Sequence, residues 1–189
     1  RVGIGASAPA RTLDVNGFIR SDGTDGGLSF GGNSSTPSEG ASIHRPANNT
    51  LAFVTDSSEQ ARIDSSGRLL VGASSSRTAG GNIAGKLQIE GTGTGGSTTA
   101  CTLTQNSNDS TGGRLMLAKS RGTSTGSVTL VQSGDQLGMI DFAGADGTNA
   151  GSSAVRIIAE VDGTPGENDM PGRLVFQIAA DGASSPSER

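Results

Sequence analysis

The chain has 189 residues, of which 31 are glycine and none is tryptophan or tyrosine, and its formal net charge is −4. Val, Ile, Leu and Phe together number only 36, whereas Gly, Ser, Thr and Asn number 84, so few large side chains are present to offset the entropy of ordering the chain around a core of its own. Its basic residues are scattered singly, which argues against nucleic-acid binding, and no run of about 18 apolar residues predicts membrane insertion. We therefore expect a chain that is extended, shares its core with other chains or is unfolded.

Apolar residues that recur with a period of two predict short β-strands along the chain. In chain order, these patterns lie at residues 13–15, 51–53, 87–89, 115–117, 127–132, 136–142, 154–161 and 173–179. In the longest pattern, residues 155, 157, 159 and 161 share an apolar face, while Arg156 and Glu160 face away. No stretch of about 11 residues carries a helical stripe without a Gly or Pro break. The fold class that the sequence predicts is all-β.

Asp-Gly pairs recur between these segments and favour tight turns over flexible linkers, because glycine supplies the positive φ that hairpins need. The pairs are Asp22-Gly23, Asp25-Gly26, Asp146-Gly147, Asp162-Gly163 and Asp181-Gly182. Short strands with one thin apolar face suit a solenoid or an intertwined trimer, in which neighbouring units or chains complete the core.

The chain contains internal repeats. Residues 1–9 (RVGIGASAP) align with residues 68–76 (RLLVGASSS), and after an insertion in the second copy residues 12–17 align with residues 86–91. A second resemblance joins residues 51–60 to residues 174–189. These repeats predict a first fibre repeat unit at residues 1–67 and a second, longer unit at residues 68–189. Because the chain starts without Met and the last copy stops within a motif, we expect both units to be cut from a longer repetitive chain.

Two glycine-rich stretches formally match phosphate-binding motifs. Residues 91–96 satisfy G-x-G-x-x-G and residues 80–86 match G-x-x-x-x-G-K, but a strand-like sequence follows each of them where the motif needs a helix. In the second stretch, Leu87 also stands where a Ser or Thr would hold the metal ion. We therefore expect no nucleotide cofactor.

The candidate catalytic and metal-binding residues have simpler interpretations. His44 is the only histidine. The sequence contains no G-x-S-x-G nucleophile elbow, and no Cys or second His stands at metal-ligand spacing from His44. We therefore interpret His44 as a surface or inter-chain hydrogen-bonding residue. The acidic cluster Asp162, Glu167 and Asp169 is typical of solvated charges on a Pro/Gly loop rather than of a glycan-cleaving pair. We expect no catalytic residue and no metal site, and hence no enzyme.

Two open points concern calcium and the single cysteine. The loop at residues 162–169, or residues 22–25, could hold Ca²⁺ through carboxylates and carbonyls, although neither has a known calcium-loop spacing. Cys101 lies in the strand-like run at residues 99–103, and we interpret it as a small buried hydrophobe rather than a reactive thiol.

Parts of the sequence resemble the repeats of marine and cyanobacterial phage tail fibres, which are often found upstream of a self-cleaving chaperone domain. The resemblance is carried by residues 63–72 (IDSSGRLLVG), residues 2–9 (VGIGASAP) and the closing residues 172–176 (GRLVF) and 181–189 (DGASSPSER). It covers roughly half of the chain and transfers no catalytic residue. Residues 92–160 resemble these repeats only in general character and share no specific motif with them.

The resemblance implies a parallel homotrimer whose chains pack apolar faces about a long axis. The expected partners are copies of itself, other virion tail proteins and a host cell-surface receptor. The receptor would be bound through a segment outside this chain. The expected location is the extracellular tail fibre of a virion. Ten residues are expected to form the inter-chain core: Leu13, Val15, Leu51, Phe53, Leu69, Val71, Leu87, Ile89, Leu174 and Phe176.

The function that the sequence predicts is therefore structural: a tail-fibre shaft segment that supports host recognition and adsorption. A bacterial or extracellular surface adhesin or filament built of the same β-repeats is an alternative, since the physics of the sequence does not separate virus from bacterium. A polysaccharide-degrading tailspike is a further alternative, although sugar sites usually use the Trp and Tyr rings that this chain lacks.

Overall fold

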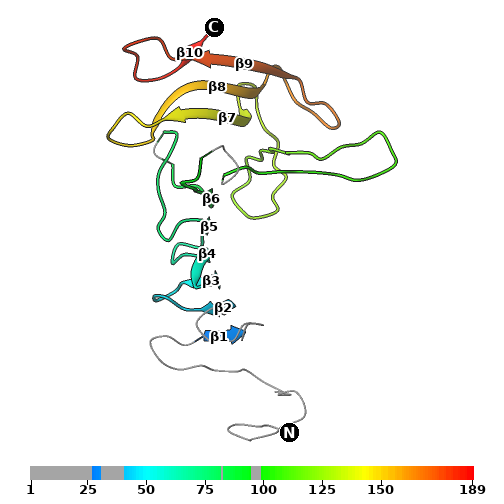
Figure 1. The fold of residues 1–189 in the computed structure, drawn as a ribbon. Helices are drawn as coiled ribbons and strands as arrows, with labels where there is room; N and C mark the ends of the chain where they lie inside the picture. Colours follow the sequence, from blue (N-terminus) through cyan, green and yellow to red (C-terminus); the bar gives the residue numbers. More distant parts are fainter. Residues whose placement is uncertain (1–26, 31–40, 82, 95–98) are drawn as a thin grey trace, which may run out of the picture. The chain divides into compact units, whose positions relative to one another are not determined.

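The computed structural model describes residues 27–30, 41–81, 83–94 and 99–189. In these residues only β-strands are found, and no helix (Figure 1). The all-β prediction is thus confirmed for the described residues. The chain divides into two compact units: the first comprises Arg1–Ser75 with Lys86–Gly91, and the second comprises Ser76–Gly85 with Thr92–Arg189. These units are defined by packing and not by sequence similarity, so the repeat boundary at residues 67 and 68 stays a prediction.

The first unit contains a six-stranded sheet whose strands neighbour one another in chain order. The strands are β1 (Gly27–Phe30), β2 (Ala41–His44), β3 (Leu51–Thr55), β4 (Ser58–Ile63), β5 (Leu69–Val71) and β6 (Leu87–Ile89). All neighbours pair antiparallel except β5 and β6, which are parallel. The strands predicted at residues 51–53 and 87–89 are confirmed, and the one predicted at residues 13–15 lies outside the described residues.

The turn between β4 and β5 shows why the repeat motif needs its particular residues. The Asp64 Oδ1 atom accepts hydrogen bonds from the backbone N–H groups of Ser66 and Arg68, at 2.9 and 3.0 Å, and Oδ2 accepts one from Arg68 Nε at 2.7 Å. These bonds, led by that from the Arg68 N–H, lower the pKa of Asp64. Gly67 closes the turn with a φ of 68°, a conformation that glycine adopts without strain.

Gly72, the first residue of the repeated Gly-Ala-Ser motif, lies where two segments of the first unit approach closely. Its φ is 75°, and a Cβ atom there would overlap the carbonyl oxygen of Glu90. The Glu90 N–H in turn donates to the Val71 carbonyl oxygen at 2.9 Å. The glycine therefore lets the end of β6 stay paired with β5.

The second unit contains a four-stranded antiparallel sheet with the order β10-β9-β8-β7. Its strands are β7 (Gln136–Gly144), β8 (Ser152–Val161), β9 (Gly172–Ile178) and β10 (Ser187–Glu188). Strands were predicted at residues 136–142, 154–161 and 173–179, and all three are confirmed. Gly147, Gly163 and Gly182 have positive φ, as the Asp-Gly turns require; Gly23 and Gly26 lie outside the described residues.

Two other predicted strands are wrong for the single chain. Residues 115–117 and 127–132 form no strand, and neither does the strand-like run at 99–103. Cys101 is exposed rather than buried, so its interpretation as a buried hydrophobe is also wrong here. The alternation of apolar and polar residues shows only that a segment is suited to a sheet. A strand forms only where a neighbouring strand completes its backbone hydrogen bonds.

The core of each unit is thin, as the composition predicts. Among the described residues, the buried apolar side chains are Ala52 and Leu70 in the first unit and Val131, Ile158, Val161 and Val175 in the second. Most other large apolar side chains are partly exposed. Where they gather decides what the molecule can bind.

Candidate self-association surface

The register of the first sheet places apolar residues from five strands on one side. Cα partners on neighbouring strands share a face of a sheet. One row of partners is Ile43, Phe53, Ala61, Val71 and Ile89, and the next is Leu51, Ile63, Leu69 and Leu87. We call this side the first apolar face, and every residue in both rows is apolar.

The first apolar face is open to solvent, whereas the opposite side of the same sheet is covered. Phe53 and Ile89 are each 38% exposed, and Leu87 is 59% exposed. On the opposite side, Arg62 lies between Ala52 and Leu70, its Cα partners on the neighbouring strands β3 and β5. Both of these side chains are fully buried. A globular domain usually has the reverse arrangement, with its apolar side buried and its charged side wet.

The charges on that opposite side are satisfied locally. Arg62 donates to both carboxylate oxygens of Glu59, and this hydrogen bonding raises the pKa of Arg62. The guanidinium and the carboxylate therefore neutralise each other within one strand.

The second sheet repeats the same design. Its register gives three apolar rows on one side: Gly138, Ala159 and Leu174; Ile140, Ile157 and Phe176; Phe142, Val155 and Ile178. We call this side the second apolar face. Phe142 is 53% exposed and Phe176 is 51% exposed, and Leu174 is more exposed still.

The other side of the second sheet combines an apolar strip with ion pairs. Ile158 and Val175 are partners there, and both are almost completely buried. An ion pair lies on each side of this Ile158–Val175 pair. In one neighbouring row, Arg156 Nε lies 3.3 Å from Asp141 Oδ2. In the other neighbouring row, Arg173 Nη2 lies 3.1 Å from Glu160 Oε2. The hydrogen bond from Arg173 to Glu160 raises the pKa of Arg173. Arg156 and Glu160 therefore face away from the apolar rows, as the sequence predicts.

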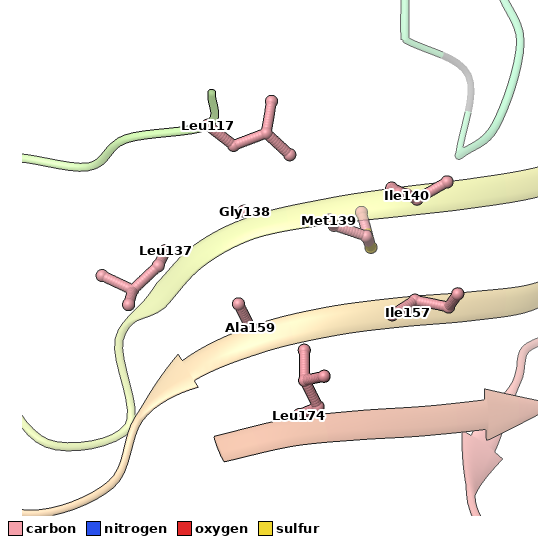
Figure 2. A pocket seen from close by; sticks show the side chains of 8 residues that line it. All are labelled: Leu117, Leu137, Gly138, Met139, Ile140, Ile157, Ala159 and Leu174. Carbon is pink, nitrogen blue, oxygen red and sulfur yellow. The ribbon is translucent and has the colours of Figure 1, made fainter. Parts of the chain in front are cut away.

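A hollow of about 140 Å³ opens at the second apolar face (Figure 2). It is lined only by glycine and apolar residues: Leu117, Leu137, Gly138, Met139, Ile140, Ile157, Ala159 and Leu174. Leu117 lies so close to Gly138 that a Cβ atom on residue 138 would be 2.6 Å from the Leu117 Cβ. The hollow thus depends on the missing side chain of Gly138, and its volume suits one large apolar side chain.

Eight of the ten residues predicted for the inter-chain core lie on these two faces. Leu51, Phe53, Leu69, Val71, Leu87 and Ile89 are on the first face, and Leu174 and Phe176 are on the second. Leu13 and Val15 lie outside the described residues. That other chains bury these eight side chains stays a prediction.

Several members of the two faces were missing from that set, notably Ile63, Ile140, Phe142 and Ile157. The signal for most of them was available, because the alternation in residues 136–142 and 154–161 puts these side chains on one side. The row that they form across strands depends on register, which the alternation alone does not give.

Among the described residues, no group of three or more His, Cys, Asp or Glu side chains is placed to hold a metal ion. Calcium at residues 162–169, where backbone carbonyls would contribute ligands, stays a hypothesis, and residues 22–25 lie outside the described part. Lys86 donates from Nζ to the Ser66 carbonyl oxygen at 2.7 Å, and a strand rather than a helix follows it.

His44 lies on β2 opposite Ala52. Its Nδ1 atom is buried and has no hydrogen-bond partner among the described residues. A base for nucleophilic catalysis would need an orienting partner there.

The comparisons with known proteins add no family. No family model matches the chain, and no curated protein matches it significantly. In the part of the chain that the structure describes, no helix has the length and apolar character needed to cross a membrane.

Proposed function

We propose that this chain is a structural, self-associating protein segment, and that it forms part of the shaft of a trimeric phage tail fibre supporting host recognition and adsorption. The observation that carries the proposal is that each sheet has one side whose paired rows are apolar and partly exposed, while Ala52, Leu70, Ile158, Val175 and the ion pairs lie on the other side. The phage setting comes from the sequence resemblance, and the self-association comes from the two faces.

Exposed apolar faces of this kind are costly for a protein that acts alone. Burying the exposed part of side chains such as Phe53, Leu69 or Phe176, which are about two-fifths to one-half exposed, would contribute roughly 2 kcal/mol each. Soluble monomers rarely leave contiguous apolar patches larger than a few hundred Å². A partner that covers both faces is therefore the simplest explanation of the sequence pattern.

The chemistry of the faces favours further copies of the same chain over a different, transient partner. Transient interfaces are enriched in Tyr, Trp and Arg, but these faces contain only aliphatic residues, alanine, glycine and Phe. That composition resembles the core of an obligate oligomer. In a closed symmetric assembly, the same face of each copy meets at the axis, so three thin apolar layers would form one core.

The proposal is tested by measuring the mass of the purified chain in solution. Sedimentation equilibrium or light scattering should give three times the 18.7 kDa of the single chain at micromolar concentration. A monomer under these conditions would contradict the proposal.

The phage setting is tested separately. Antibodies against the 189-residue chain should label tail fibres of virions in electron micrographs. Labelling of bacterial surfaces alone would favour the adhesin alternative, and release of new reducing ends from host polysaccharide would favour the tailspike.

A further inference from the structure

Residues 99–119 of the second unit form two extended arms joined by an ordered turn, the green excursion in Figure 1. We call residues 99–104 and 112–119 the two arms. At the turn, Asp109 Oδ1 accepts hydrogen bonds from the Thr111 N–H at 2.8 Å, the Thr111 hydroxyl at 2.6 Å and the Ser107 hydroxyl at 3.0 Å. Gln105 Nε2 donates to the same two hydroxyl groups. The tip is therefore a fixed turn that directs both arms.

The arms have the residues of strands but no strand partner. Among the described residues, no backbone–backbone hydrogen bond involves residues 99–119. Their large apolar side chains are also open: Leu103 is 56% exposed, Leu115 72% and Met116 75%. An extended segment that exposes both its backbone groups and its apolar side chains lacks both interactions that normally hold a strand in place.

The same unit also carries a strand edge without a neighbour. β7 is the last strand of its sheet and has nine residues, and among the described residues its backbone pairs only with β8. Its sequence, QLGMIDFAG, contains no Lys or Pro, two residue types that commonly protect an edge strand from further pairing. A register shift between Gln136 and Gly138 makes the first residues of β7 irregular, so the regular part of this edge begins at Gly138. A free edge of this length is suited to receive an extended segment by strand addition.

Within one chain, the arm does not use this edge. Leu117, near the end of the second arm, contacts β7 through its side chain at Gly138 and not through backbone hydrogen bonds. Among the described residues, one copy therefore has one unpaired edge and a pair of arms without backbone hydrogen bonds, and a second copy can supply an arm for the edge and an edge for an arm. This complementarity identifies the partner as another copy of this chain.

We infer that the two arms are an exchanged pair of strands: in the assembly, the backbone of one arm pairs with the free edge of β7 in a second copy of this chain, and the other arm, which approaches it at Leu103 and Gly113, pairs with the first arm. The inference rests on the self-association proposed above and adds the segment that links the copies. It also assigns a role to residues 99–104 and 112–119, which the apolar faces leave unexplained.

Hydrogen exchange on the intact 189-residue chain, combined with a mass measurement on the same sample, tests the inference. In the oligomer, the amides of both arms and of β7 should exchange at least about tenfold more slowly than in an unstructured peptide, because paired amides must open before they exchange. An oligomer whose arms exchange at the unstructured rate overturns the inference but leaves the proposed function intact. A monomer overturns both, and protected arms with an unprotected β7 overturn the assignment of the acceptor edge.

The single cysteine provides a second readout without changing the arms. Cys101 is exposed in the single chain, so a thiol reagent should modify it several-fold more slowly in the oligomer than after dissociation in urea. The matched control is Cys101→Ser combined with Ser110→Cys, which moves the thiol to the exposed turn and should react equally fast in both states. Equal reactivity of Cys101 and of this control thiol in the oligomer would contradict the exchange.

A proline in one arm tests the backbone pairing directly. Thr102→Pro removes one backbone N–H at an exposed position and should shift the oligomer toward smaller species, whereas Ser110→Pro at the turn should not. If both variants assemble like the unmodified chain, backbone pairing of the first arm is excluded.

Discussion

The two sheets are built from strands of different length. In the first sheet the strands have three to six residues, whereas β7, β8 and β9 of the second sheet have nine, ten and seven. Among the described residues, the first unit buries only the apolar side chains Ala52 and Leu70, while the second unit buries four aliphatic side chains that include Ile158 and Val175. Longer strands thus give the second unit a small core of its own, although both sheets leave one apolar face open.

This difference implies that the two units depend unequally on assembly. Among the described residues of the first unit, Leu70 is the only buried apolar side chain larger than alanine, so we expect its sheet to need a covered apolar face to stay folded. The second unit should keep its sheet when copies separate. The predictions below test this contrast, in order of decreasing expected effect.

Replacing Phe53 by Ala should have the largest effect, because Phe53 lies in the middle of the first apolar face. If this face is buried in the assembly, the change should lower the stability by about 3–5 kcal/mol per chain, seen as a lower melting temperature of the oligomer. Thr55→Ala, an exposed change at the end of the same strand, is the control. Unchanged melting of the Phe53→Ala protein would exclude Phe53 from an inter-chain core.

Replacing Ile158 by Ala should lower the stability of the second unit by about 2–5 kcal/mol, because Ile158 is buried within a single chain. The loss should not depend on protein concentration. Phe176→Ala, on the open face of the same sheet, should instead weaken the oligomer more strongly on dilution. Urea unfolding at two protein concentrations separates the cases, and equal concentration dependence of both variants would contradict the contrast between a private and a shared core.

Replacing Gly138 by Ala should cost about 1–3 kcal/mol through overpacking, because the new methyl group would meet Leu117. Gly144→Ala on the same strand is the matched control, since no atom lies within 4 Å of the added Cβ. The double variant Gly138→Ala with Leu117→Ala should recover part of the loss in chemical unfolding. If the double variant is no more stable than Gly138→Ala alone, contact with Leu117 is not the cause.

The smallest effect concerns acid. A hydrogen bond from Arg121, whose Nε lies 2.6 Å from Asp135 Oδ2, is the main cause that lowers the pKa of Asp135 from 3.8 to about 2. Since the folded pKa is lower than the unfolded one, the stabilisation is fully present above about pH 4 and is lost as the pH falls through about 2. Asp135→Asn should therefore flatten the acid limb of the urea midpoint against pH, and so should Arg121→Gln, which removes the hydrogen bond that lowers the pKa of Asp135 most. An unaltered acid limb in Asp135→Asn would argue against this pair as its source.

The three long strands of the second sheet were predictable because their alternation runs over seven or more residues, and the turns because Asp-Gly pairs require a positive φ. The two-residue strand β10 was not predicted, since so short a segment carries no alternation. The buried side chains were not predictable in the same way. Leu70 lies between two residues of the open face and points to the covered side, and which side a loop covers depends on the tertiary fold. The arms were misjudged for a related reason: residues 115–117 have a strand pattern, but pairing depends on an edge that local sequence does not specify.

The parallel pairing of β5 with β6 has a mechanical consequence. The chain leaves the first unit after Ser75, contributes Ser76–Gly85 to the second unit, returns to place β6 beside β5, and leaves again after Gly91. A cut after Ser75 or after Gly85 cannot separate the two units without pulling β6 out of its sheet, and a cut after Gly91 cannot do so without removing Ser76–Gly85 from the second unit. A pulling force transmitted along the chain would therefore load the hydrogen bonds between β5 and β6 rather than a single loose tether.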